Sequence, residues 1–163
     1  MGYTFLFPGQ GAQFPGMGRD LYDASESVRE LFSQASHEVG FDVAELLFNG
    51  SEEELQATDN TQIAVTLVNL AAARVLRERG VEPERVAGFS LGEYAALVEA
   101  GVMDAKDVFP VVRTRGELME RASRALDTEA GPAGMSAVLG LDYDTVQDVL
   151  EREQIENAYP GMF

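Results

Sequence analysis

The sequence contains no cysteine, and its only histidine is His37. Without cysteine the chain has no disulfide, no thiolate metal ligand and no cysteine nucleophile. A single histidine also excludes a metal site built from several histidines within this chain alone. We therefore expect no metal site and no cofactor.

Basic residues are also few, with 12 Lys and Arg against 28 Asp and Glu. The formal net charge of −16 disfavours sequence-independent binding to nucleic acid or to an anionic membrane. The chain lacks a run of about 18 apolar residues, so we expect no transmembrane helix. No basic start leads into an apolar stretch, so we expect no signal peptide and a cytoplasmic protein.

The 163 residues are about one domain's length of chain, and 45% of them are hydrophobic, which is enough to bury a core. Short β-rich runs alternate with longer segments of helical periodicity. We expect strands at 3–7, 85–89 and 134–140, and helices at 20–39, 43–48, 61–79, 93–100, 105–126 and from Asp142 to about 151. Ser51, followed by three acidic residues, and Asp142 are the expected N-caps of helices, and residues 128–134 are the expected linker. Strands separated by long helices predict an α/β fold with a mainly parallel sheet, in which the first two strands lie side by side.

The segment Gly88–Gly92 reads G-x-S-x-G at a strand-to-helix boundary. Its glycines lack a Cβ, so strand and helix can approach closely while Ser90 takes a strained conformation. The Ser90 hydroxyl would then lie at a helix N-terminus, where the next backbone N–H can stabilise an oxyanion. The pattern predicts a nucleophile elbow. A serine N-cap on a short helix is the alternative.

The loop after the first strand contains Gly9-Gln10-Gly11. A dinucleotide-binding fingerprint would need a third glycine where Phe14 stands, so nucleotide binding is disfavoured. Loops at the carboxyl ends of neighbouring parallel strands share one crevice. We therefore expect Gln10 beside Ser90, where its amide can donate an N–H. A plain glycine turn is the alternative.

Four motifs follow one another along the chain, at Phe7–Gln13, Asn60–Gln62, Gly88–Tyr94 and Arg113–Gly116. In order and spacing they resemble the malonyl-CoA:acyl-carrier-protein transacylase family, whose acyltransferase fold also occurs in polyketide and fatty-acid synthases. The resemblance covers essentially the whole chain. It implies ping-pong transfer of malonyl from coenzyme A to a serine, and then to the phosphopantetheine thiol of acyl carrier protein.

The resemblance also implies an organisation into two parts. Residues 1–127 would form part of an α/β-hydrolase-like large subdomain with a parallel sheet, and residues 128–163 would begin a small ferredoxin-like subdomain. Family members are about double this length, so the chain looks truncated. Either it is a fragment or a partner chain supplies the rest, and we expect self-association through the incomplete small subdomain.

The site residues follow from the same resemblance, position by position. Ser90 matches the acylated serine, and Gln10 with the backbone N–H of Leu91 matches the oxyanion hole. Arg115 matches the arginine that binds the free carboxylate of malonyl. A guanidinium can hold a carboxylate with two parallel hydrogen bonds, which selects malonyl over acetyl. For Arg115 taken alone, an ordinary helix-surface arginine is the alternative.

Two features depart from the family pattern. Phe89 stands where the family usually has histidine, which changes the wall of the site. The family's catalytic histidine would lie beyond Phe163, and His37 does not match it by motif. We read His37 as a solvated or half-buried residue of a helix far from the active-site loops.

Other functions stay open at this point. A serine hydrolase would need a histidine and an acid after the serine in chain order, and no histidine follows Ser90. A non-catalytic subunit could bind coenzyme A or acyl carrier protein and be completed by a partner chain. The acidic charge disfavours binding of an acidic carrier protein unless Arg113, Arg115, Arg121 and Arg124 gather into a basic patch. For Arg113, Arg121 and Arg124, ordinary solvated helix charges are the favoured interpretation.

Overall fold

The computed structural model describes residues 2–127, 131 and 134–161, and the chain forms two compact units, Met1–Leu126 and Asp127–Phe163. The first unit has the α/β fold with a parallel sheet that the sequence predicts. Within the described ranges no helix is long and apolar enough to cross a lipid bilayer.

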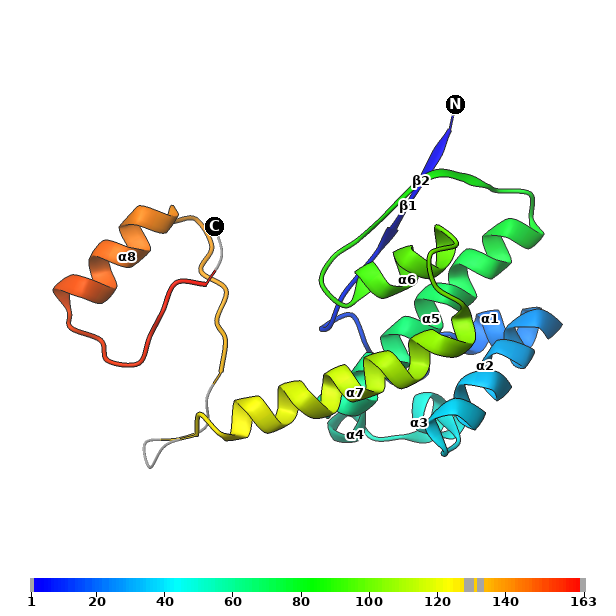
Figure 1. The fold of residues 1–163 in the computed structure, drawn as a ribbon, viewed down its shortest axis with the longest axis horizontal. Helices are drawn as coiled ribbons and strands as arrows, with labels where there is room; N and C mark the ends of the chain where they lie inside the picture. Colours follow the sequence, from blue (N-terminus) through cyan, green and yellow to red (C-terminus); the bar gives the residue numbers. More distant parts are fainter. Residues whose placement is uncertain (1, 128–130, 132–133, 162–163) are drawn as a thin grey trace. The chain divides into compact units, whose positions relative to one another are not determined.

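The sheet of the first unit joins two segments that lie far apart in the sequence (Figure 1). Strand β1 (Tyr3–Phe7) pairs in parallel with β2 (Pro83–Gly88), so that Phe7 lies opposite Gly88. Successive side chains point to opposite faces of a strand. Phe5 and Phe7 are accordingly buried against the helices, whereas Leu6 is 74% exposed on the other face.

Two long helices form the centre of the core. Helix α5 (Thr58–Glu78) packs along α7 (Ala105–Arg124), and α2 (Glu26–Val39) contacts both. The first half of α5 is buried nearly all round, as its continuous apolar sequence predicts. The shorter helices of this unit are α1 (Arg19–Ala24), α3 (Val43–Asn49), α4 (Glu52–Gln56) and α6 (Gly92–Glu99), which packs on both strands.

The single helix expected over residues 20–39 is wrong, because the structure divides it into α1 and α2. The break is at Ser25, whose backbone is extended and whose Oγ accepts a hydrogen bond from the Val28 N–H at 3.3 Å. Serine favours this N-cap position because its hydroxyl satisfies an N–H that the helix leaves unpaired. The expected cap at Ser51 is confirmed, since Ser51 and Glu54 form a capping box at the start of α4.

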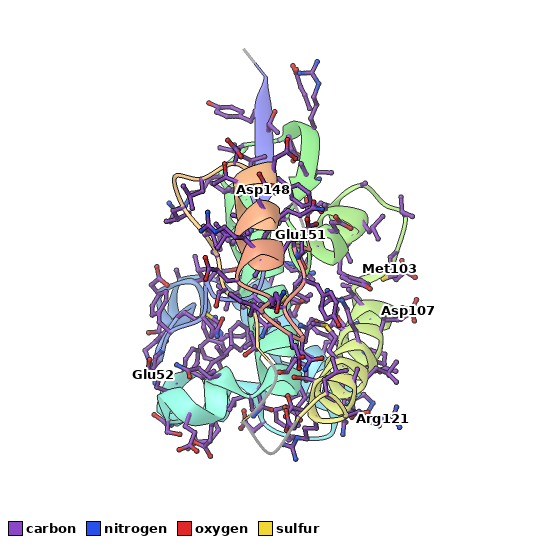
Figure 2. The ribbon with its side chains drawn as sticks, turned by 90° about the vertical axis from the view of Figure 1, so that its left-hand side faces the viewer. Glu52, Met103, Asp107, Arg121, Asp148 and Glu151 are labelled. Atoms are coloured by element: carbon purple, nitrogen blue, oxygen red, sulfur yellow. The ribbon has the colours of Figure 1, made fainter. Side chains whose placement is uncertain are left out.

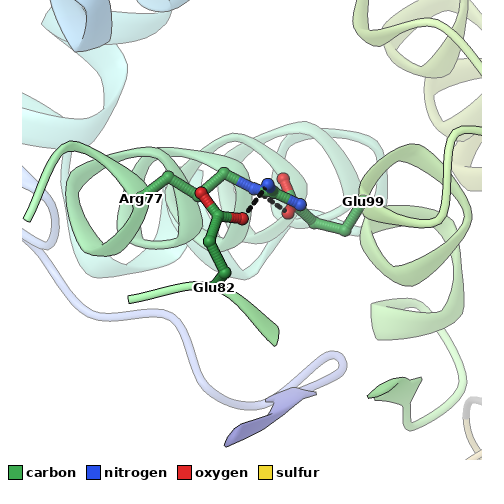
Figure 3. A network of polar contacts seen from close by, with 3 residues as sticks. All are labelled: Arg77, Glu82 and Glu99. Carbon is green, nitrogen blue, oxygen red and sulfur yellow. Dashed lines mark hydrogen bonds and ion pairs between the residues drawn. The ribbon is translucent and has the colours of Figure 1, made fainter. Parts of the chain in front are cut away.

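A small ionic network joins the end of α5 to its neighbours (Figure 3). Arg77 donates from Nε to Glu99 at the end of α6 at 2.8 Å, and from Nη1 to Glu82 just before β2. The carboxylates of α6 and of the chain leading to β2 therefore meet on one guanidinium. Helix α6 begins directly after the predicted elbow. The network therefore holds the C-terminal end of the helix whose N-terminal end adjoins the elbow.

The second unit contains α8 (Tyr143–Arg152), which Asp142 caps as predicted by accepting from the Thr145 N–H at 2.8 Å. The strand expected over residues 134–140 is wrong, since the described residues 134–141 form no regular secondary structure. A strand is stable only when it pairs with another, and this segment has no partner strand in the described part of the unit. The linker expected at 128–134 lies mostly outside the described residues, and the ferredoxin-like assignment stays a prediction.

Candidate active site

The turn between β2 and α6 has the conformation of a nucleophile elbow. Ser90 has φ 51°, in the left-handed region that a residue with a side chain rarely occupies. The turn is held by two backbone hydrogen bonds, from the Gly92 N–H to the Phe89 carbonyl at 2.9 Å and from the Glu93 N–H to the Ser90 carbonyl at 3.1 Å. A strained serine on a well-held turn is typical of a functional position.

Three glycines make this turn sterically feasible. A Cβ on Gly88 would lie 2.2 Å from the Glu93 nitrogen, and one on Gly92 would lie 2.1 Å from the Phe7 carbonyl oxygen. A Cβ on Gly9 would lie 2.6 Å from the Phe89 carbonyl oxygen. The strand, the helix and the loop after β1 therefore approach at distances that only glycine allows, as the G-x-S-x-G pattern predicts.

The first turn of α6 leaves one donor unused next to Ser90. The N–H groups of Gly92, Glu93 and Tyr94 each donate to a carbonyl of the turn, whereas the Leu91 N–H has no hydrogen-bond partner among the residues that the structure describes. The Leu91 side chain is buried, and Ser90 is exposed. A free N–H beside an exposed hydroxyl at a helix N-terminus is suited to stabilise an oxyanion.

The loop after β1 lies against α5 through two polar side chains. Asn69 donates from Nδ2 to the Pro8 carbonyl at 3.0 Å, and Gln62 donates from Nε2 to the Gln10 Oε1 at 3.2 Å. Gln62 and Asn69 are both buried, and Gln10 is exposed. The glycine loop is thus anchored by side chains of α5, which a plain turn would not require.

Arg115 extends this group from α7 to the elbow. Its Nη1 donates to the Gln62 Oε1 at 2.5 Å, and its Nη2 donates to the Ser90 Oγ at 3.4 Å. The guanidinium also lies 5.8 Å from the centroid of the Tyr94 ring, within range of a cation–π contact. Arg115 is therefore not an ordinary helix-surface arginine, because its side chain connects α5 with the serine turn.

A glycine next to Arg115 explains how α7 reaches α5 at this point. A Cβ on Gly116 would lie 2.8 Å from the Asp59 Cα, so glycine at this position allows the two helices to approach closely. Ser90, Gln10 and Arg115, which the sequence singles out separately, consequently belong to one hydrogen-bonded cluster. Gln62 connects Gln10 with Arg115, although the sequence motifs predict no role for it. A glutamine in an apolar, buried stretch of helix was the signal for it.

The acyl transferase domain family matches residues 4–147. The chain belongs to this family. The malonyl CoA-acyl carrier protein transacylase of Bacillus subtilis (strain 168) is 40% identical over 149 residues, which are 91% of this chain and 45% of that protein. The corresponding protein of Staphylococcus aureus (strain MRSA252) is 39% identical over 146 residues, again 45% of its length. The chain thus spans about half the length of the curated relatives it matches.

Solved structures of this family have the same fold as the acyl transferase chain. A malonyl transacylase crystal structure from Streptococcus pneumoniae matches with a TM-score of 0.82 at 38% identity, over 95% of this chain and 49% of that one. A malonyl-transacylase in complex with a type II polyketide acyl-carrier protein matches with a TM-score of 0.79 at 36% identity, over 93% and 48%. The family resemblance carried by the four motifs is confirmed.

The remaining candidates of this acyl transferase chain lie outside the cluster. His37 is exposed on α2 and lines a surface hollow of about 570 Å³ with residues of α1 to α3 and the turns beside them. Along α7, Arg113 pairs with Glu117 at 3.0 Å and Arg124 with Glu120 at 2.8 Å, and Arg121 is exposed (Figure 2). Arg113 also donates from Nη1 to the Val39 carbonyl of α2. Arg113 and Arg124 are thus each paired with a glutamate of their own helix rather than with the Arg115 cluster.

No cluster of metal-ligating side chains appears in the described ranges: no three of His, Asp or Glu gather there to hold an ion. Phe89 is 68% exposed beside Ser90, and its effect on the wall of the site stays a prediction.

Proposed function

We propose that this chain carries the serine half-site of a malonyl-CoA:acyl-carrier-protein transacylase, with Ser90 as the residue that is acylated. The observation that carries the proposal is the Ser90 hydroxyl on a left-handed turn, 3.4 Å from the Arg115 guanidinium. This guanidinium nitrogen contacts the Ser90 hydroxyl, and a bound substrate carboxylate would compete for it. The relatives named malonyl CoA-acyl carrier protein transacylase support the choice of substrates.

In the proposed reaction the Ser90 Oγ attacks the thioester carbonyl carbon of malonyl-CoA. The carbon–sulfur bond breaks, the serine proton passes to the departing sulfur, and coenzyme A leaves as the thiol. In the second half-reaction the phosphopantetheine thiol of acyl carrier protein attacks the serine ester and restores the hydroxyl. Both half-reactions pass through an oxyanion, which the Leu91 N–H and the Gln10 amide would stabilise.

Substrate choice would rest on Arg115. Its guanidinium can form two charge-assisted hydrogen bonds with the terminal carboxylate of malonyl and none with acetyl. The Tyr94 ring at 5.8 Å supports the guanidinium from the side. The proposal therefore predicts a preference for an acyl group that ends in a carboxylate.

The test is malonylation of Ser90 followed by intact-mass measurement. Incubation with malonyl-CoA should add one malonyl group, and Ser90→Ala should abolish the addition. The exposed α2 residue Ser33 provides the matched control, since Ser33→Ala should leave the addition unchanged. An adduct that persists in Ser90→Ala would overturn the assignment of the nucleophile.

The reaction of this chain should be slow. A serine hydroxyl without an adjacent base is a weak nucleophile, and His37 lies on the exposed surface of α2 rather than in the cluster. The lack of a general base typically costs ~10²–10⁴-fold in rate. Rapid and complete transfer of malonyl to acyl carrier protein would contradict this expectation.

A non-catalytic binding function is the alternative that this test has to exclude. In that case the cluster would bind coenzyme A thioesters without turnover. Calorimetric titration with malonyl-CoA distinguishes the two, because a binding subunit would give a measurable affinity and no covalent adduct.

A further inference from the structure

Gln62 is the buried centre of the cluster. Gln62 is 0% exposed although its side chain carries a polar amide. The Nε2 and the Oε1 of this amide each form a hydrogen bond with a side chain of the proposed site. A buried amide costs free energy unless its donor and acceptor are satisfied. The two hydrogen bonds therefore hold the Gln62 amide in one of its two orientations.

The direction of these bonds follows from what each group can do. A guanidinium only donates, so Arg115 must face the oxygen of Gln62, at 2.5 Å. The NH₂ end of Gln62 then faces Gln10, and because an NH₂ group only donates, Gln10 must present its Oε1, at 3.2 Å. The Oε1 of Gln10 is thereby occupied by Gln62, and the NH₂ group of Gln10 forms no hydrogen bond with Gln62.

We propose that Gln62 is a positioning residue that sets the orientation of the Gln10 amide and links this orientation to Arg115. It leaves the Gln10 NH₂ as the donor for a reacting carbonyl, a step that rests on the proposed function. Through Gln62 the group that binds a substrate carboxylate and the group that stabilises the oxyanion form one hydrogen-bonded chain. A substitution of Arg115 should therefore change the orientation of the Gln10 amide.

A purely structural role for Gln62 would be to join α5 to the glycine loop. Asn69, two turns further along α5, has that role independently, since it binds the backbone carbonyl of Pro8 at 3.0 Å. Among the described residues, the Asn69 side chain forms no hydrogen bond with Gln10 or Arg115. It is therefore a matched control, a buried amide on the same helix that binds the same loop without orienting Gln10.

The test is a double-mutant cycle read by the side-chain amide NMR signal of Gln10. In the otherwise unchanged chain, Arg115→Met should shift this signal, because it removes the donor that polarises Gln62. In Gln62→Met, which keeps the length and removes both hydrogen bonds, the same Arg115→Met should cause no shift. In Asn69→Leu the shift should persist. Equal shifts with and without Gln62, or none in either, would overturn the proposal.

A second variant tests the direction of the hydrogen bonds and replaces Gln62→Met if that chain does not fold. In Gln62→Glu the carboxylate still accepts from Arg115 but can no longer donate to Gln10. Gln10 should then turn its NH₂ toward the carboxylate, and exchange of the NH₂ protons with water should slow. Unchanged exchange in Gln62→Glu would show that Gln62 does not set the Gln10 amide.

A ligand titration separates this inference from the proposed function. Malonyl-CoA should move the Gln10 signal more than acetyl-CoA does, and Gln62→Met should remove the difference. If neither thioester binds, the proposed function fails, and the mutant cycle still decides the role of Gln62. If malonyl-CoA binds and the difference survives in Gln62→Met, the proposed function stands and the role of Gln62 is refuted.

Discussion

At the scale of single residues, the cluster depends on one arginine and a few glycines. Arg115 contacts Gln62 and Ser90 at once, and glycines at the elbow allow backbone contacts that any Cβ would block. These residues act through geometry as much as through chemistry, because a serine on a relaxed turn would not present its hydroxyl beside a free N–H.

Replacing Arg115 with methionine should weaken malonyl-CoA binding and leave acetyl-CoA binding unchanged. A hydrogen bond to a charged group contributes about 1.5–3 kcal/mol, which corresponds to a loss of about tenfold or more in affinity. Calorimetric titration of both thioesters measures the effect. Arg121→Met, at an exposed position of the same helix, is the control and should change neither affinity.

Replacing Gly92 with alanine should destabilise the first unit and displace the serine turn. The added Cβ would lie 2.1 Å from the Phe7 carbonyl oxygen, so β1 and α6 would have to separate. We expect a loss on the order of 3 kcal/mol in the free energy of unfolding, measured with urea. Gly134→Ala, where no atom lies within 4 Å of the new Cβ, should stay within about 0.5 kcal/mol. Equal effects of the two would refute the steric argument.

At the scale of elements, a capping side chain sets where a helix begins and can also join that helix to a neighbouring one. Ser25 is the single extended residue between α1 and α2. Its Oγ donates to Glu78 on α5 at 2.8 Å, and the Ser27 Oγ donates to the same carboxylate at 2.5 Å. The start of α2 is thereby joined to the end of α5. Hydrogen bonds from Ser27 and then Ser25 lower the pKa of Glu78 below its usual value.

This junction should make stability fall at acidic pH. The folded-state pKa of Glu78 lies below the unfolded value, so its contribution is fully present above the unfolded pKa and is lost as the pH falls through the folded pKa. Glu78→Gln should therefore be less stable than the parent at neutral pH, with a difference that shrinks as the pH falls into the acidic range and Glu78 becomes protonated. Urea unfolding across this range is the measurement.

The control for that pH experiment is Glu30→Gln, which removes an exposed carboxylate of α2 without touching Ser25 or Ser27. It accounts for the change in net charge alone. If Glu78→Gln and the parent keep a constant difference from neutral to acidic pH, the two serine hydrogen bonds do not act on stability through Glu78.

At the scale of the molecule, the first unit is stabilised by the contact between α5, α7 and α2. The site lies where the loop after β1 and the start of α6 meet side chains of α5 and α7. Fully buried residues of the core include Phe32, Leu67 and Phe109. On β1, Phe5 and Phe7 are buried in this core, whereas Leu6 is exposed on the opposite face of the strand. Only one face of β1 therefore contributes to the core.

Truncation of a core residue should therefore cost far more than truncation of the same residue type at the surface. Leu67 is 0% exposed and Leu76, on the same helix, is 39% exposed. Leu67→Ala should lower the free energy of unfolding by about 2–5 kcal/mol, because it removes apolar contacts and leaves a cavity. Leu76→Ala should cost less than half as much. Similar values for both would show that α5 is not the centre of the core.

The sequence by itself determined the features that neighbouring residues encode. The helical periods, the caps at Ser51 and Asp142, the parallel α/β architecture and the glycine pattern around Ser90 depend on local conformation and on burial, which the order of residue types specifies. The family followed from four short motifs for the same reason.

Only the tertiary structure decided how distant side chains meet. Gln62 contacts Gln10 across 52 positions and Arg115 across 53, and these bonds exist because α5 packs against both the loop and α7. The strand expected at 134–140 failed for the complementary reason. An extended segment becomes a strand only when another strand pairs with it, and no local pattern of residues can supply that partner.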